Sequence, residues 1–387
     1  MIIGIVTFWE AYDNYGQVLQ CWALQKKLES MGHKPYVIRY KLNGVVKEDV
    51  KQKVVGYLRK IYRSLKSIIK GDYYNLKLVK KNNSKRDFEG FRNRFYNLSP
   101  EIYNSISELR KNPPSADSYI CGSDQIWGYK IKEEESDVFY LDFGNDQLLR
   151  IAYAPSFGMV SYPNELKQKL AGRLSRFDAI SVREYGGVKI CEEVGFHAEH
   201  VLDPSLLLNG TDYKKIMDIK KNVIEDYVFV YSINVNNPND LSWESIKKYS
   251  KERGLKVIAT ASSGYLPARE LLDGAIYEYP RVNEWLSLIA YSKLVVTTSF
   301  HGIAFCLIYH KPFVYVPLKG EHSSGNCRVS ELLDSLNLTA QILHNENSFS
   351  EIAENIILWD DVEKRLNAMR TASSRFIESS LQLNKQV

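Results

Sequence analysis

Paired cysteines, a leader segment and long apolar runs are all lacking in this sequence of 387 residues, and each absence excludes a class of protein. The five cysteines stand far apart without a CxxC pair, which argues against a disulfide framework and against structural zinc. Glu10 and Asp13 interrupt the first apolar run and no basic leader precedes it, so we expect neither a signal peptide nor a membrane anchor. The most apolar later stretch, residues 294–316, contains polar residues and a proline, which predicts strands and a helix instead of a membrane span. Together these absences favour a cytoplasmic protein.

Signatures of nucleotide and metal binding are also lacking. No GxGxxG run occurs, so a dinucleotide cofactor is not predicted, and no cluster of His, Cys, Asp and Glu predicts a metal site. The formal net charge is only +5, but residues 47–94 hold fifteen basic against five acidic residues. Apolar positions recur in this block at helical spacing, which leaves open a solvated helical insertion packed on the core or a helix on an anionic membrane face. Nucleic-acid binding is not expected, because no aromatic platform or known motif accompanies the charge.

What is present is the composition of a globular chain, with 44% hydrophobic and 25% charged residues, and its length predicts two domains. Strand patterns alternate with helical patterns, which is typical of parallel sheets covered by helices. The predicted strands cover residues 2–8, 36–40, 118–121, 150–154, 179–182, 200–202, 227–233, 256–261, 294–298 and 313–316. We therefore predict an α/β domain over residues 1–210, with a basic helical insertion at about 45–95, and a second α/β domain over residues 211–387. Whether the last helix, over about 362–381, returns to the first domain stays open.

Ligands of such sheets bind beyond the carboxyl ends of the strands, so the segments that follow the predicted strands are the candidate site. The first such segment contains Asp13, Asn14 and Tyr15 and leads into a helix. A helix amino terminus offers free N–H groups to an anion or a sugar hydroxyl. The alternative is that Asp13 or Asn14 only caps the helix.

Two further segments follow strands in the predicted first domain. Asp124 and Gln125 supply a carboxylate and an amide, and Trp127 offers a ring face to a sugar, although the same residues also suit an ordinary turn. Arg183 carries a fork of donors for a carboxylate or phosphate, and its alternative role is a structural salt bridge to Glu184 or another carboxylate. Asp203 follows another strand, where a role limited to the domain junction is the other possibility.

The sharpest local pattern, Ser299-Phe300-His301-Gly302, joins an apolar strand to a helix in the predicted second domain. Here the N–H groups of Gly302 and Ile303 are expected to face an anion, and a histidine at this point suits proton transfer near neutral pH. A lone histidine is otherwise often structural. Arg328 stands near the start of a later helix, where it either meets a phosphate or caps a surface helix.

Taken in chain order, these segments resemble the polysaccharide pyruvyltransferase family. The matching segments are residues 14–20, 122–127, 153–158, 181–184, 201–204 and 299–302, and the resemblance spans roughly residues 1–340. It implies two Rossmann-like domains whose parallel sheets face a cleft, as in the two-domain glycosyltransferases termed GT-B. It further implies transfer of the enolpyruvyl group of phosphoenolpyruvate onto two hydroxyls of a glycan sugar as a cyclic ketal, in bacterial capsule or exopolysaccharide biosynthesis. The acceptor is then a glycan or lipid-linked oligosaccharide at the inner membrane face. Whether the protein also contacts anionic lipid at the membrane surface stays open.

The resemblance also suggests roles for individual residues. His301 is the expected acid, with Asp124 or Asp13 as the base, and phosphoenolpyruvate is the donor substrate without a metal or other cofactor. The donor-binding residues are Arg183, Ser299, Gly302 and Arg328, and the acceptor-binding residues are Asn14, Tyr15, Gln125 and Trp127.

One position departs from the family pattern, because several members carry an arginine where this chain has Ser299. Either Arg328, Arg281 or Lys319 supplies the missing cation, or the donor differs. Two alternatives therefore stay open: a nucleotide-sugar-dependent glycosyltransferase of GT-B type, and a non-catalytic glycan-binding protein of the same fold.

Overall fold

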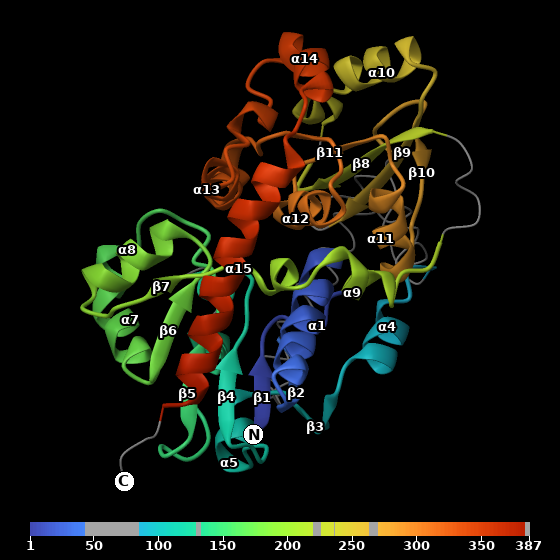
Figure 1. Ribbon diagram of the computed structural model, residues 1–387. Helices are drawn as coiled ribbons and strands as arrows, with labels where there is room; N and C mark the ends of the chain where they lie inside the picture. Colours follow the sequence, from blue (N-terminus) through green and yellow to red (C-terminus); the bar gives the residue numbers. More distant parts are fainter. Residues whose placement is uncertain (43–84, 129–132, 220–225, 236, 263–269, 384–387) are drawn as a thin grey trace, which may run out of the picture.

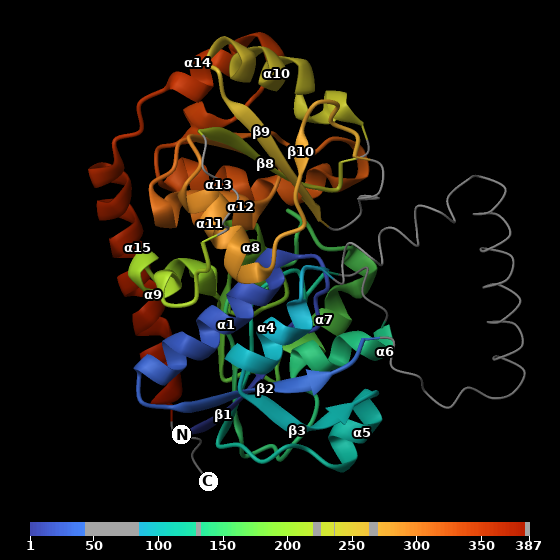
Figure 2. The ribbon, with the colours of Figure 1, turned by 90° about the vertical axis from the view of Figure 1, so that its right-hand side faces the viewer.

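Two parallel β-sheets, each covered by helices, form the framework of the protein and lie one above the other in two perpendicular views (Figures 1 and 2). The structure is a computed structural model that describes residues 1–42, 85–128, 133–219, 226–235, 237–262 and 270–383. Most of the predicted basic insertion, residues 43–84, lies outside the described residues. The part built around the first sheet is the first lobe, and the part built around the second sheet is the second lobe.

The first sheet has seven strands in the order β3-β2-β1-β4-β5-β6-β7, and every neighbouring pair is parallel. The strands are β1 (Ile2–Val6), β2 (Lys34–Tyr40), β3 (Leu98–Tyr103), β4 (Ser118–Cys121), β5 (Leu149–Ala152), β6 (Ala179–Val182) and β7 (Glu199–His200). The inner strands β4 and β5 are buried at every position, because helices cover both faces of a parallel sheet. The chain reverses its direction of growth between β1 and β4, which is where ligands of such sheets bind.

The first helix shows how local sequence fixes these elements. Asn14 caps it by accepting a hydrogen bond from the N–H of Gln17, and Gly32 follows its end with a φ of +84° that suits glycine. The helices and turns around the first sheet are α1 (Tyr15–Ser30), α4 (Phe88–Phe95), α5 (Ile106–Lys111), α6 (Glu133–Ser136), α7 (Lys167–Leu174), α8 (Tyr185–Glu193), η1 (Asp137–Tyr140), η2 (Asn164–Leu166) and η3 (Pro204–Leu207).

The second sheet has five parallel strands in the order β10-β9-β8-β11-β12, and its reversal lies between β8 and β11. The strands are β8 (Tyr227–Ile233), β9 (Lys256–Ser262), β10 (Ile276–Tyr277), β11 (Leu294–Thr297) and β12 (Phe313–Tyr315). The remaining helices and turns are α9 (Gly210–Lys214), η4 (Pro238–Leu241), α10 (Trp243–Glu252), α11 (Val282–Ala290), α12 (Phe300–Tyr309), η6 (Gly320–Asn326), α13 (Cys327–Ser335), η7 (Thr339–Gln341), η8 (Glu346–Ser348), α14 (Phe349–Glu354) and α15 (Trp359–Leu381).

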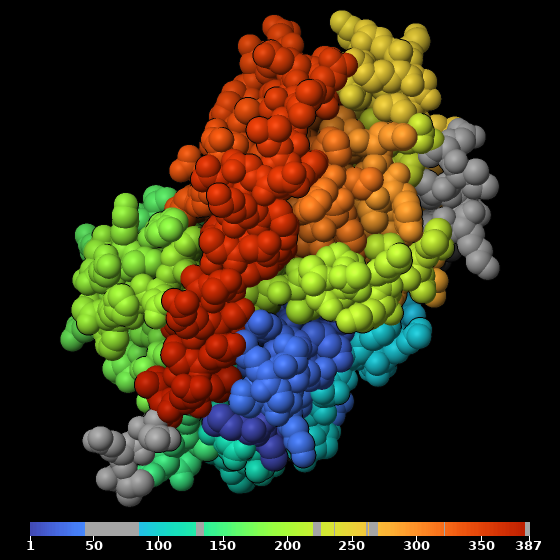
Figure 3. Space-filling model, in the orientation of Figure 1, coloured from blue at the N-terminus to red at the C-terminus, as the bar shows by residue number. Residues whose placement is uncertain are grey.

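The last helix, α15, runs along both lobes in the ribbon and space-filling views (Figures 1 and 3). At its start Trp359 stacks on His310 of the second lobe. Further along, the hydroxyl of Ser373 accepts a hydrogen bond from the N–H of Leu202, and Arg370 donates to the carbonyl of Leu206. The last helix therefore reaches the first lobe, while the domain boundary near residue 210 stays a prediction.

The structure confirms the α/β class with two parallel sheets. All five cysteines are free, and four of them are buried. No helix among the described residues has the length and apolar character that crossing a bilayer requires.

Candidate active site

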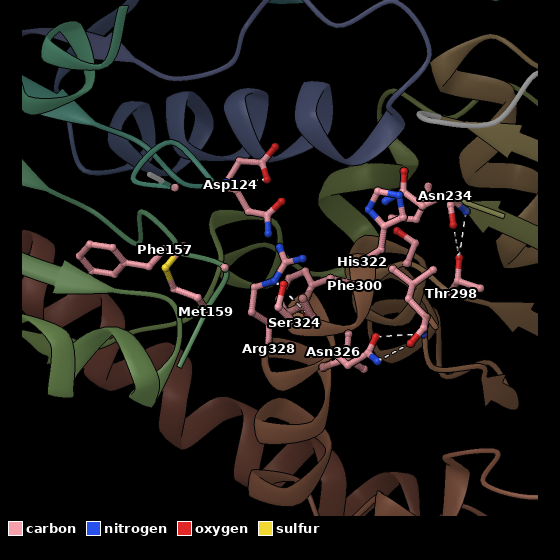
Figure 4. Close-up of a pocket in the computed structure, with 18 of the residues that line it drawn as sticks. Asp124, Phe157, Met159, Asn234, Thr298, Phe300, His322, Ser324, Asn326 and Arg328 are labelled. Atoms are coloured by element: carbon pink, nitrogen blue, oxygen red, sulfur yellow. Dashed lines mark hydrogen bonds between the residues drawn. The ribbon is translucent and has the colours of Figure 1, made fainter. Parts of the chain in front are cut away.

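A cleft of about 990 Å³ lies at the carboxyl ends of the strands of both sheets. The segments that follow β1, β4, β8, β11 and β12 all contribute to its lining, so the reversal points of the two sheets face the same space. Figure 4 shows Asp124 from the first lobe above Arg328 from the second lobe, so both lobes supply side chains to this space. The predicted site residues that line the cleft are Asn14, Asp124, Gln125, Ser299, His301 and Arg328.

Asp124 occupies a strained backbone position directly after β4. Its φ is +81°, in the left-handed region that non-glycine residues rarely adopt, and the carbonyl of Asp124 accepts the N–H of Ser156. One carboxylate oxygen, Oδ1, accepts the N–H of Gln125 at 2.8 Å. The other, Oδ2, is buried and has no hydrogen-bond partner among the described residues. A buried acceptor without a partner is costly, so this oxygen has an unsatisfied capacity to accept a hydrogen bond.

Asp203 connects the two lobes beneath the cleft, a role that the sequence analysis missed. Its Oδ2 accepts hydrogen bonds of 2.8 Å from Ser123 Oγ and from Arg183 Nη1, and lies 3.5 Å from His301 Nε2. Its Oδ1 accepts both the N–H and the hydroxyl of Ser205. Burial alone would raise the pKa of Asp203, but His301, Arg183 and Ser205 hold that pKa far below its usual value. Asp203 is therefore a fixed anion that faces the imidazole.

His301 lies in the first turn of α12, with only 6% of its surface exposed. Ser299 caps this helix, because its Oγ accepts the N–H of Gly302 and its carbonyl accepts the N–H of Ile303. The prediction that Gly302 and Ile303 aim their N–H groups at an anion is therefore wrong, since Ser299 already satisfies both. The N–H groups of Phe300 and His301 precede them, at positions where an α-helix supplies no acceptor of its own.

Gly16 of α1 lies directly against the ring of His301. A Cβ atom at position 16 would lie 2.1 Å from His301 Nδ1 and 2.2 Å from its Cγ, which is far inside van der Waals contact. The first lobe thus contacts the histidine of the second lobe through a residue without a side chain. Because the imidazole ring of His301 lies so close to the backbone of α1, only a glycine fits at position 16 of the Asn14-Tyr15-Gly16 segment.

Arg183 is buried and does not line the cleft. Its Nη1 pairs with Asp203, its Nη2 lies 3.8 Å from Asp124 Oδ1, and the ring centre of Phe300 lies 4.6 Å from the guanidinium carbon. Desolvation would lower the pKa of Arg183, but the carboxylates of Asp203, Asp124 and Glu184 raise it. Glu184 forms no ion pair with Arg183 and instead accepts the N–H groups of residues 157 and 158.

Arg328 is the arginine that lines the cleft among the described residues. It lies in the first turn of α13, and its Nε donates to the carbonyl of Gly325 at 3.2 Å. Within the described part of the chain no carboxylate lies at ion-pair distance from it. Burial and the nearby charge of Arg183 lower the pKa of Arg328, so an anion beside the two guanidinium groups would be stabilised. Arg281 and Lys319, the other cations considered, do not line the cleft.

Besides Arg183 and Gly302, three further predicted residues lie outside the cleft lining. Trp127 is 1% exposed, donates its ring N–H to the carbonyl of Phe139 and stacks on Tyr140, so neither ring face is free for a sugar. Tyr15 is fully buried and donates its hydroxyl to the carbonyl of Pro280. Both side chains belong to the core in this structure. Asp13 contacts its neighbours through its carbonyl, which accepts Ser262 Oγ.

Metal ligands were not predicted, and the described residues contain no group of three or more His, Cys, Asp and Glu side chains that could hold a metal ion. The cleft lining offers a carboxylate, an imidazole and a guanidinium group to a substrate, from Asp124, His301 and Arg328. The chemistry that this arrangement supports is proton transfer next to a bound anion.

A sequence model of the family described as polysaccharide pyruvyl transferase matches residues 14–319. The chain belongs to this family. A search of curated proteins finds no match. The pyruvyl transferase fold is similar to that of the S. aureus MnaA–UDP co-structure, with a TM-score of 0.52 and 11% identity over 98% of this chain and 96% of that chain. It is also similar to an alpha-glucosyltransferase in complex with UDP and a 13-mer DNA containing a central A:G mismatch, with a TM-score of 0.51 and 11% identity over 97% of this chain and 95% of that chain.

At identities this low the likeness concerns the fold alone. It confirms the GT-B-like arrangement that the sequence predicted. The family match and the cleft together point to a transferase whose site lies between the two lobes.

Proposed function

We propose that this pyruvyl transferase moves the enolpyruvyl group of phosphoenolpyruvate onto two hydroxyls of a glycan sugar and closes a cyclic pyruvate ketal. The observation that carries the proposal is the buried pair of His301 and Asp203, 3.5 Å apart, in the wall of a cleft that also holds Arg328 without an ion-pair partner among the described residues. Such a site combines a positioned acid with a cation for a substrate that carries a phosphate and a carboxylate.

The reaction begins with proton transfer from the imidazolium of His301 to the methylene carbon of phosphoenolpyruvate, which becomes a methyl group. Positive charge then develops on the neighbouring carbon, and a sugar hydroxyl attacks it while a base takes the hydroxyl proton. We assign this role to Asp124, because Asp124 lines the cleft and its buried Oδ2 has no hydrogen-bond partner among the described residues. Loss of phosphate and attack by a second hydroxyl complete the ketal, so that one donor and one diol give one ketal and one phosphate.

Electrostatic stabilisation comes from groups that are already in place before the donor binds. Arg328 and the first N–H groups of α12 offset the charge of the donor and of the departing phosphate. Asp203 stabilises the imidazolium of His301, and Arg183 keeps Asp203 in position through its 2.8 Å hydrogen bond. In this proposal Arg328 supplies the positive charge that other members place at the position of Ser299, and no cofactor other than the donor is needed.

Release of phosphate from phosphoenolpyruvate, with galactose, glucose and N-acetylmannosamine as acceptors, tests the reaction directly. We expect acceptor-dependent phosphate from the wild type and a loss of at least about 10²-fold in His301→Gln, because general acid catalysis contributes that much. His344→Gln is the matched control, since His344 is exposed and lies outside the cleft. If no acceptor elicits phosphate while a nucleotide sugar raises the melting temperature, glycosyl transfer replaces pyruvyl transfer as the function.

A cytoplasmic location at the inner membrane face belongs to the same proposal, and its support is the basic block of residues 47–94. Sedimentation with anionic vesicles tests it, with wild type compared to a variant neutralised at Lys51, Lys53, Arg59, Lys60 and Arg63. Equal sedimentation of the two proteins would contradict membrane contact through this block.

A further inference from the structure

A second hollow of about 350 Å³ adjoins the catalytic cleft on the first lobe. The two spaces share Phe8 and Gln17, which follow β1 and lie at the border between them. The remaining walls are mostly aromatic and come from the ends of β1 and β2 and from η1: Thr7, Trp9, Glu10, Tyr12, Tyr40, Leu42 and Phe139. The catalytic chemistry proposed above uses none of these side chains.

The aromatic walls are held in fixed positions. The ring N–H of Trp9 donates to the carbonyl of Tyr40 at 2.7 Å, and Phe8 meets Phe139 edge to face with ring centres 5.1 Å apart. Arg92 of α4, itself buried, places its guanidinium 5.4 Å from the ring centre of Tyr12 and 5.7 Å from that of Trp9. A side chain fixed in this way loses little conformational entropy when it binds a ligand.

Tyr12 is the member of this wall that presents its ring to solvent, with 56% of its surface exposed. Its hydroxyl donates to Glu10 Oε1 at 2.8 Å, so a carboxylate lies beside the ring. The side-chain amide of Gln17 has no hydrogen-bond partner among the described residues and lies at the border with the catalytic cleft. Apolar ring faces combined with a few fixed polar groups match a sugar ring, which has an apolar face and a rim of hydroxyls.

We propose that this hollow is a second acceptor subsite, which holds the sugar residue next to the one that receives the pyruvyl group. The inference rests on the proposed function, and it adds where the neighbouring sugar unit of the acceptor is recognised. Phe8 and Gln17 line both spaces, so a glycan that extends past these two side chains would occupy both. The volume lies at the lower end of the range for small-molecule pockets, as a single sugar ring requires.

The test compares acceptors of different length that share a terminal sugar. Monosaccharides and the corresponding disaccharides of galactose, glucose and N-acetylmannosamine serve as probes with the full-length protein. We expect Tyr12→Ala to raise the KM of the disaccharide about tenfold more than that of the monosaccharide, while Tyr12→Phe, which keeps the ring, retains most of the length preference. Tyr291→Ala is the matched control, because Tyr291 is 54% exposed on the second lobe and outside both spaces.

Equal changes in KM for both acceptor lengths, or no change for either, would overturn the subsite. Direct titration of the same saccharides without phosphoenolpyruvate separates this outcome from failure of the proposed reaction. Disaccharide binding that weakens in Tyr12→Ala supports the subsite even if no phosphate is released. A wild type that binds no disaccharide more tightly than the monosaccharide contradicts it.

Discussion

Each lobe contributes one arginine to the site, and the two arginines differ in their ion-pair partners and in their contact with the cleft. Arg183 of the first lobe is buried, bonded to Asp203 and covered by Phe300. Arg328 of the second lobe lines the cleft and has no ion-pair partner among the described residues. Charge on the first lobe is therefore used to hold the site together, whereas charge on the second lobe is left for a ligand. A cation is available to a substrate only where the protein has not already neutralised it.

Removal of Arg183 is expected to have the largest effect, and on stability. Arg183→Ala leaves Asp203 in a buried position without its nearest charged partner, so we expect a loss of about 3–5 kcal/mol of unfolding free energy in urea. Arg281→Ala is the control, because its ion pairs with Glu284 and Asp218 lie at the surface and should contribute less than about 1 kcal/mol. A stable Arg183→Ala protein with a raised KM for phosphoenolpyruvate would contradict the structural role of Arg183, because it would show that Arg183 binds the donor.

Contact between the lobes is tested by Gly16→Ala. The added methyl group must displace His301, and a misplacement of about 1 Å at a catalytic group can cost about 10²-fold in kcat. Gly172→Ala is the matched substitution on α7, where no atom lies within 4 Å of the added Cβ, and there we expect about 0.5–1 kcal/mol of added stability. Unchanged kcat in Gly16→Ala would show that His301 tolerates displacement and would argue against its role as the acid.

Loss of the cleft arginine should act on binding and not on folding. Arg328→Ala is expected to raise the KM for phosphoenolpyruvate by about 10- to 100-fold, because a hydrogen bond to a charged group contributes about 1.5–3 kcal/mol. Lys319→Ala, which removes an exposed cation outside the cleft, should leave this KM unchanged. Equal effects of the two substitutions would mean that general charge, and not Arg328, attracts the donor.

The smallest expected effect is a change in pH dependence. The pKa of Asp203 in the folded protein lies below its value in the unfolded chain, so its contribution to stability is complete above the unfolded pKa of about 3.9 and is lost as the pH falls through the folded pKa. One such carboxyl changes stability by at most about 1.4 kcal/mol per pH unit. Urea unfolding of wild type and Asp203→Asn between pH 2.5 and 5 should therefore differ in slope below about pH 4. Equal slopes of the two proteins in that range would contradict this assignment.

Most inner strands could be predicted from the sequence because apolar runs mark strands that are buried on both faces. The strands missed were β3 and β10, which lie at the sheet edges. In β3, Pro100 and Glu101 interrupt the apolar pattern, and an edge strand tolerates both because one side of it has no ladder to complete. Local pattern thus predicts buried strands, including the buried edge strand β12, and misses the edge strands β3 and β10, which have exposed positions.

For the site, sequence position predicted which residues lie near the strand ends but not where their side chains point. Asp124 and Trp127 are three residues apart, yet the carboxylate faces the cleft and the indole stacks in the core. The role of Asp203 was missed because its partners Ser123, Arg183 and His301 are distant in sequence and meet only in the folded chain. Side-chain direction and long-range partners depend on tertiary packing, which local patterns do not contain.

The path of α15 bears on how the protein can fold during its synthesis. The hydrogen bond between Leu202 and Ser373 joins residues 171 positions apart, and Phe376 packs against Tyr153. At about 5–20 residues per second, a ribosome needs roughly 10–30 s to add the chain between these partners. Throughout that interval the nascent first lobe exposes the apolar surface that α15 later covers. The first lobe is therefore complete only after the second lobe has been synthesised, and chaperone dependence should be greatest in the time before the last helix emerges.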